Sequence, residues 1–165
     1  MAARSRAVDD AGLRVFTAPP FEASRLRSDR ERVELDQIAS CMEKDGWIVD
    51  RLGETSARTL FRCGDATLPV FVWTEDAFAV FAIVPFVRIE RDVETCDELF
   101  ALLLTLNRKI NLARFGVDPD GDVALSVEWR RENLDPSEVR DALDVLAFYA
   151  RNHRAAIAAL AAPIP

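Results

Sequence analysis

The chain has 165 residues, half of which are hydrophobic, and its formal net charge is −7 at pH 7. This length and apolar content suit one domain with a substantial core and an additional segment. The acidity argues against nucleic acid as a partner, because proteins bind its phosphates with lysine and arginine. No stretch is long and apolar enough to cross a membrane, and the start of the chain has no hydrophobic signal core. We therefore expect a cytoplasmic protein without a membrane partner.

Residues 1–27 are predicted to form a tail, and residues 28–162 a single folded domain. Alanine, arginine and serine dominate the tail, and Pro19-Pro20 interrupts regular structure. The first 32 residues hold seven arginines and five acidic residues, which leaves 14 basic and 23 acidic residues, a net charge of −9, for the rest. The apolar run at residues 13–16 either belongs to a flexible leader or docks on the domain or on a partner.

A helix followed by a meander of strands is predicted after the tail. The helix begins near Ser28 or Asp29, which are good caps, and ends at Gly46, where a left-handed residue is usual. Short apolar runs separated by turns follow, and their short connections imply antiparallel pairing. These predicted strands are Trp47–Val49, Arg58–Cys63, Leu68–Trp73 and Phe78–Val84, the last ended or bent by Pro85.

A second helix is predicted from Thr95 to Ile110. Thr95 is its cap, and Glu98 stands at the spacing of a capping box. One apolar stripe, which we expect to pack on the sheet, consists of Leu99, Leu102, Leu103, Leu106 and Ile110. Phe100 and Leu104 lie beside that stripe, so this helix has a second apolar surface to bury.

The remaining residues predict a hairpin and a closing helix. Residues 111–117 and 123–129 are the strands, and Asp118–Asp122 is the turn between them. This aspartate-rich run has some likeness to a calcium loop, but its glycine comes too early and the final position holds Trp129, so a tight turn is favoured. Arg130-Arg131 is a small basic spot that we expect to be a solvated strand end. Asp135, Pro136 and Glu138 mark the start of the last helix.

These elements predict an α+β fold, an antiparallel sheet with helices gathered on it. The predicted order is α-β-β-β-α-β-β-α, with three or four strands before the second helix.

No catalytic or metal-binding constellation is evident in the sequence. His153 is the single histidine, and neither a nucleophile nor a second metal ligand accompanies it. The three cysteines form no CxxC pair, and we expect them to be reduced and mostly buried: Cys41, Cys63 and Cys96. We therefore predict neither catalytic residues nor a cofactor nor a metal.

The third predicted strand carries two aromatic residues on one face. Strand alternation places Phe71 and Trp73 on one side of the sheet and Val70 and Val72 on the other. If helices cover only one side, the aromatic side is a partner surface, and Phe71 and Trp73 are the candidates for binding a client. Helices on both sides, or cover by the tail, would leave no such surface.

Short runs in and after the second helix carry a resemblance: Leu106-Asn107-Arg108, Arg114–Asp118 and Asp120–Val123. Together with a first helix ending in Gly46-Trp47, the apolar meander and the long final helix, they make the chain resemble the YbjN domain family. More widely, residues 32–160 resemble the fold of type III secretion chaperones.

The resemblance implies an α-β-β-β-α-β-β-α sandwich that is commonly a homodimer and has no catalytic residues. In secretion chaperones of this fold the second helix is often at the dimer interface, which implies a homodimer contact at Phe100, Leu104 and Asn107. Our first hypothesis is a dimeric, chaperone-like or regulatory module that binds an unidentified protein or peptide client. The alternative is a small-ligand sensor or an enzyme with a pocket between sheet and helices. A third hypothesis is an interaction domain that serves a larger assembly through its tail.

Overall fold

The computed structural model describes residues 33–90 and 96–163. It contains α1 (Leu35–Lys44), β1 (Asp50–Arg51), β2 (Ser56–Cys63), β3 (Ala66–Glu75), β4 (Phe78–Val87), α2 (Asp97–Asn107), β5 (Ala113–Val117), β6 (Val123–Arg130) and α3 (Pro136–Ala161). The predicted α+β class is confirmed, with the very short β1 as an additional strand. None of the described helices combines the length and apolar character needed to span a membrane.

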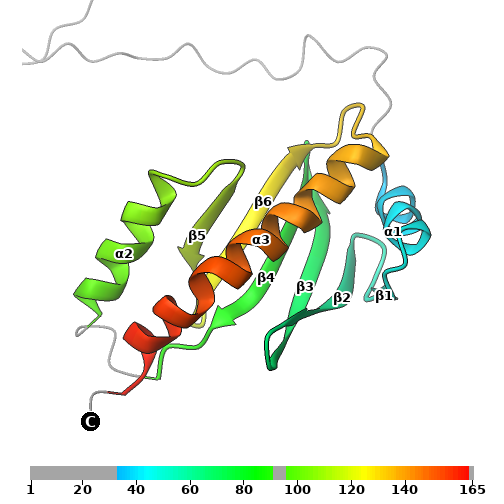
Figure 1. Cartoon of the computed structure of the whole chain (residues 1–165). Coiled ribbons are helices and arrows are strands. Elements are labelled where there is room, and N and C mark those ends of the chain that lie inside the picture. The colour runs from blue at the N-terminus through cyan, green and yellow to red at the C-terminus, as the bar shows by residue number, and fades with distance from the viewer. Residues whose placement is uncertain (1–32, 91–95, 164–165) are drawn as a thin grey trace, which may run out of the picture. The chain divides into compact units, whose positions relative to one another are not determined.

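The strands form a single six-stranded sheet in the order β1-β2-β3-β4-β6-β5 (Figure 1). Every neighbouring pair is antiparallel. The first four strands are a meander. The connection through α2 then takes the chain to the far edge strand β5, and β6 returns between β5 and β4. The predicted antiparallel meander and the predicted hairpin therefore form one sheet, because β4 of the meander pairs with β6 of the hairpin.

One face of the sheet is covered by the helices. α3 runs obliquely across it, with α1 and α2 toward its two edges (Figure 1). Every second strand residue points into a single core shared with all three helices. Its largest fully buried members include Leu35, Ile38 and Met42 of α1, Leu99 of α2, Leu146 and Ile157 of α3, and Val70, Val72, Phe81, Ile83 and Leu125 of the strands.

α3 begins as the sequence predicts. The Asp135 carboxylate accepts hydrogen bonds from the Ser137 N–H (2.7 Å) and the Glu138 N–H (3.1 Å), and the Glu138 carboxylate accepts one from the Asp135 N–H (3.0 Å). This capping box satisfies N–H groups that have no partner within the helix. The hydrogen bonds from Ser137 and Glu138 hold the pKa of Asp135 below its usual value.

α1 begins at a different residue from the one predicted. Glu34 is its N-cap and forms a capping box with Gln37, whereas the predicted caps Ser28 and Asp29 lie outside the described residues. Its predicted end is confirmed, because Gly46 follows the helix with a φ of +90°. The Arg140 side chain of α3 donates hydrogen bonds to the Asp45 carboxylate (2.8 and 3.1 Å), which lowers the pKa of Asp45 and ties the two helices together.

The predicted strand at Trp47–Val49 is wrong. Trp47 and Val49 pack against the core without strand pairing, and Ile48 between them is 84 % exposed. The Ile48 carbonyl accepts a hydrogen bond from the Thr59 hydroxyl (2.7 Å), so a side chain occupies the place of a ladder partner. Strand pairing starts only at Asp50 and lasts two residues.

The apolar stripe predicted for the second helix is confirmed. Leu99 and Leu103 are buried, and the rest of the stripe packs half-buried against the core: Leu102, Leu106 and Ile110. α2 begins at Asp97 with Cys96 as its N-cap and no side-chain capping bond, and the predicted cap Thr95 lies outside the described residues.

β4 carries an irregularity at Pro85. Ile83 pairs with Leu125 and Val87 with Val123, so four positions along β4 oppose two along β6. As a result, the neighbours Phe86 and Val87 are both buried in the helix-covered core.

Candidate interaction surfaces

The sheet face opposite the helices carries both aromatic residues predicted to bind a client. Phe71 lies between Arg58 and Ala82 in the register, and Trp73 lies between Ser56 and Val80. Phe71 and Trp73 are half-buried, and neither belongs to the core, whereas Val70 and Val72 do. We call this surface the open face, defined by the apolar side chains of Leu60, Pro69, Phe71, Trp73, Phe78 and Val84.

The open face is an apolar strip with ionic margins. Leu60 is 59 % exposed and Phe78 is 43 % exposed. Arg58 pairs with Asp50 (3.1 Å) toward one edge of the sheet, and Arg114 pairs with Glu128 toward the other. Such a strip suits an extended apolar segment better than a small polar ligand.

The edge of the sheet beside the open face is largely unpaired. β1 pairs only with residues 57 and 58 of β2. Residues 60–63 of β2 therefore have no strand partner on that side within the described part of the chain. An exposed strand edge offers backbone donors and acceptors to an additional strand.

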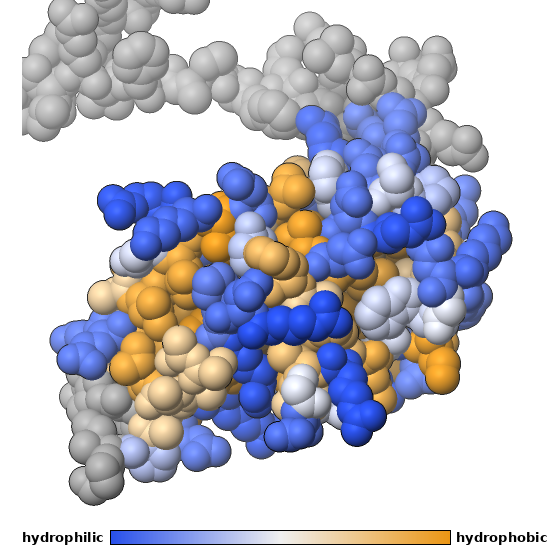
Figure 2. Space-filling model, viewed as in Figure 1, coloured by the Kyte–Doolittle hydropathy of each residue, from blue (hydrophilic) through white to orange (hydrophobic). Residues whose placement is uncertain are grey.

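The second helix places its three predicted interface residues in three different environments. Leu104 points outward and is 71 % exposed. Phe100 is half-buried and packs against the core. Figure 2 shows apolar side chains gathered over α2 and the part of α3 next to it. Of the three predicted interface residues, Leu104 is therefore the one with an exposed apolar side chain in the single subunit.

Asn107 is engaged within the subunit. Its side-chain amide donates a hydrogen bond to the Phe115 carbonyl (2.9 Å), and its side-chain oxygen accepts one from the Phe115 N–H (2.7 Å). Asn107 thereby satisfies the backbone N–H and carbonyl of Phe115 on the side of the edge strand β5 that faces away from β6. It ties the end of α2 to the sheet.

His153 belongs to an aromatic cluster. Its ring stacks on Tyr149 (5.9 Å between centroids) and meets Phe115 edge-on (6.1 Å). The Tyr149 hydroxyl accepts a hydrogen bond from the Asn111 N–H (3.0 Å). The histidine thus helps to pack α3 onto β5.

The predicted solvated strand end is wrong for one of its two arginines. Arg130 is exposed, but Arg131 is only 7 % exposed. Arg131 donates hydrogen bonds to the carbonyls of Val33 (3.0 Å) and Asp76 (3.1 Å) and pairs with the Glu34 carboxylate (2.6 Å). Because its partners are far away in the chain, the sequence contains no local signal for this role.

The aspartate-rich run forms the predicted tight turn. The Asp118 carboxylate accepts hydrogen bonds from the N–H groups of Asp120 (3.0 Å) and Asp122 (2.9 Å), and Gly121 has a φ of +89°.

Cys63 and Cys96 are buried and Cys41 is half-buried. Among residues 33–90 and 96–163, no three histidine, cysteine or acidic side chains converge in a way that could hold a metal ion.

Solved structures with a similar fold include a regulator and a chain of a secretion-system complex. YbjN from E. coli, described as a putative transcription regulator, has a TM-score of 0.57 and 12 % identity, with 78 % of this chain and 96 % of YbjN covered. A chain of the heterodimeric ExoU–SpcU complex from the type III secretion system of Pseudomonas aeruginosa has a TM-score of 0.50 and 14 % identity, with 73 % and 94 % covered. The predicted resemblance to the YbjN and type III secretion chaperone fold is confirmed.

At these identities the likeness establishes the fold alone. No protein-family model matches the sequence. No curated protein matches it either.

Proposed function

We propose that the protein is a non-enzymatic, homodimeric module of the cytoplasm, chaperone-like or regulatory, that binds an extended segment of a client protein. The observation that carries the proposal is the open face, because Phe71 and Trp73 lie outside the core while the helices pack on the opposite side. Covering exposed apolar surface is favourable in water, which favours a partner there.

An extended client can use two features of this side of the molecule. The unpaired part of β2 supplies backbone hydrogen bonds to an added strand, and the open face supplies apolar contacts for alternate client side chains. The likeness to a chain from a heterodimeric secretion-system complex supports a protein as the kind of partner.

The proposed homodimer rests on α2. Residues 100, 104 and 107 are spaced by four and three positions, so they share one side of the helix. Leu104 contacts the partner subunit with its exposed side chain. Phe100, one turn earlier on the same side of α2, is half-buried next to it. Asn107 is already hydrogen-bonded to Phe115, so we expect it to hold β5 in position beside the interface.

Light scattering tests the dimer. We expect the wild type to be a dimer and Leu104→Glu a monomer, because the substitution would place a charge in the apolar contact. Ile48→Glu is a matched control, since Ile48 is also exposed (84 %) but follows α1, at the other edge of the sheet. If Leu104→Glu remains a dimer, this interface is wrong.

Selection from a displayed random-peptide library tests the client site. We expect enriched peptides with apolar residues at alternate positions, which bind the wild type and Phe148→Ser. The same peptides should lose binding to Phe71→Ser and Trp73→Ser variants that retain the wild-type fold by circular dichroism. Peptides that bind all four proteins equally would place the client site elsewhere, and failure to enrich any peptide would contradict the protein-binding role.

A further inference from the structure

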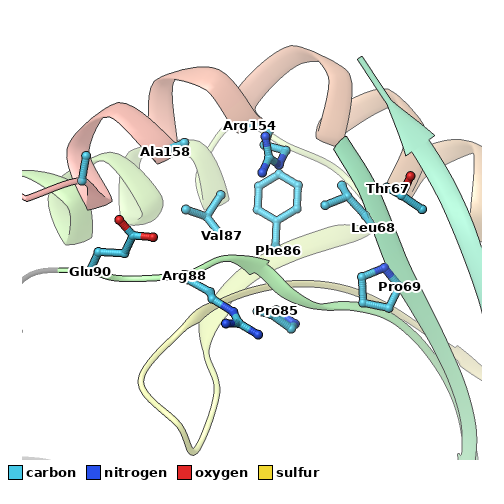
Figure 3. A pocket seen from close by; sticks show the side chains of 11 residues that line it. Thr67, Leu68, Pro69, Pro85, Phe86, Val87, Arg88, Glu90, Arg154 and Ala158 are labelled. Atoms are coloured by element: carbon cyan, nitrogen blue, oxygen red, sulfur yellow. The ribbon is translucent and has the colours of Figure 1, made fainter. Parts of the chain in front are cut away.

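A cavity of about 500 Å³ opens beneath the second half of α3, where β3 begins and β4 ends (Figure 3). Its walls include Leu68 and Pro69 of β3, Phe86 and Val87 of β4, and Arg154 and Ala158 of α3. The volume lies in the range of sites that bind small molecules. The cavity borders the open face at Pro69, but it opens on the helix-covered side of the sheet and includes no residue of α2.

The sequence accounts for the opening. The β3–β4 ladder ends at the pair Val70 and Ile83, and the next positions toward the cavity include Pro69 and Pro85. Proline has no N–H for the ladder, so the two strands part at this point. Above the gap, α3 presents Arg154 and Ala158 four residues apart on one side of the helix, and the small alanine leaves the space unfilled.

Arg154 contributes a buried polar atom without a partner to the lining of this cavity. Its Nε atom is buried and has no hydrogen-bond acceptor, and its guanidinium makes no ion pair with any residue in the described part of the chain. In Figure 3 the Arg154 side chain descends from α3 toward the Phe86 ring, which rises from β4. A buried N–H without an acceptor carries a desolvation penalty that a bound anion would remove.

The charged residues of the lining also indicate the sign and the size of the charge that a bound ligand would carry. Its charged residues are Arg88, Arg154 and Glu90, a net charge of +1 in a domain that is otherwise strongly acidic. Arg88 points to the other side of β4, and Glu90 stands toward the far end of the cavity from Leu68 (Figure 3). One available guanidinium and a nearby carboxylate suit a single negative charge better than a doubly charged phosphate.

We propose that this cavity, the Arg154 pocket, binds a small organic acid with an apolar body. The ligand carboxylate accepts hydrogen bonds from the Arg154 guanidinium, and the apolar part lies against Leu68, Phe86 and Ala158. This site does not depend on client binding or on the dimer, so failure of either proposal leaves the other standing.

Octanoate is the probe for the test, titrated into the full-length ¹⁵N-labelled protein. We expect saturable chemical-shift changes at the amides of Leu68, Val87 and Ala158. Octan-1-ol, which has the same chain without the charge, should not saturate these shifts.

Two substitutions test the site in different ways. Arg154→Gln should weaken octanoate binding about tenfold or more, because a charge-assisted bond to the carboxylate is lost. Ala158→Leu should abolish binding by filling the cavity while every charge remains. Arg151→Gln is the matched control and should bind like the wild type, because Arg151 stacks over Phe61 (5.1 Å from its ring centre) and does not line the cavity.

Three results would overturn the assignment. The first is an octanoate titration that does not saturate. The second is equal affinity of the wild type and Arg154→Gln, provided that their spectra show the same fold. The third is saturation by inorganic phosphate at these amides without saturation by octanoate, which would assign a different anion to the pocket.

Discussion

A single buried arginine joins three segments of the chain. Arg131 connects the start of α1, the β3–β4 turn and the end of β6 through Val33, Asp76 and Glu34. The backbone repeats the link, because the Arg131 N–H donates to the Ala77 carbonyl (2.8 Å) and the Val33 N–H donates to the Arg131 carbonyl (3.0 Å).

Replacing this arginine should destabilise the fold strongly. Arg131→Met keeps the apolar stem but removes the hydrogen bonds to two carbonyls, and we expect a loss of about 2–4 kcal/mol in the free energy of unfolding by urea. Arg130→Met is the control, because Arg130 is exposed, and should change stability by no more than about 0.5 kcal/mol. Equal effects of the two substitutions would contradict the role of Arg131.

Asn107 gives a second prediction at this scale, which separates subunit stability from assembly. We expect Asn107→Ala to lower the free energy of unfolding by about 1–3 kcal/mol, because both backbone groups of Phe115 lose a partner. Hydrogen exchange at the Phe115 amide should accelerate. Leu104→Ala, on the same helix, removes an exposed side chain and should leave that exchange rate unchanged in the isolated subunit. Slow exchange in Asn107→Ala would show that another group protects the edge.

At the scale of elements, the start of α3 makes stability sensitive to acid. Because the folded pKa of Asp135 lies below its unfolded value of about 3.9, the ionised cap stabilises the fold above the unfolded pKa. That contribution is lost as the pH falls through the folded pKa. The wild type should therefore lose stability more steeply below about pH 4 than Asp135→Ser, whose hydroxyl caps without titrating. Urea midpoints of the two proteins measured across this range check it.

The elements that the sequence predicts well are those with local signals. The α3 cap is contained in residues 135–138, and the alternation of β6 is contained in residues 123–129, so both are predictable without tertiary information. The short β1 and the start of α1 are not predictable in this way, because they depend on residues far away in the chain. The Thr59 hydroxyl bonds the Ile48 carbonyl before β1, and Arg131 bonds the Glu34 carboxylate at the start of α1.

The candidate sites divide in the same way. The direction of Phe71 and Trp73 follows from strand alternation, but which face stays open depends on where the helices pack. The Arg154 pocket forms where Pro69 and Pro85 lie beneath α3, which is far away in the sequence, so no pattern within one segment predicts it.

At the scale of the molecule, the buried core residues in the described part of the chain all lie between positions 35 and 161. We therefore expect a chain that begins at residue 28 to unfold at the same urea concentration as the full chain, and to bind the selected peptides equally. Equilibrium unfolding and peptide titration of both chains check this. A lower midpoint would show that residues 1–27 stabilise the domain, and weaker peptide binding would support the hypothesis that the tail carries the interaction.

The position of α3 in the chain has a consequence for synthesis. It follows every strand in sequence and yet contacts α1, α2, β2, β4 and β6. On the ribosome, the part of the helix-covered face that lies under α3 consequently stays uncovered until residues 136–161 have been made, at a rate of about 5–20 residues per second. During that interval a nascent sheet would expose apolar residues on both faces, so we expect the domain to complete its core only after α3 has been made.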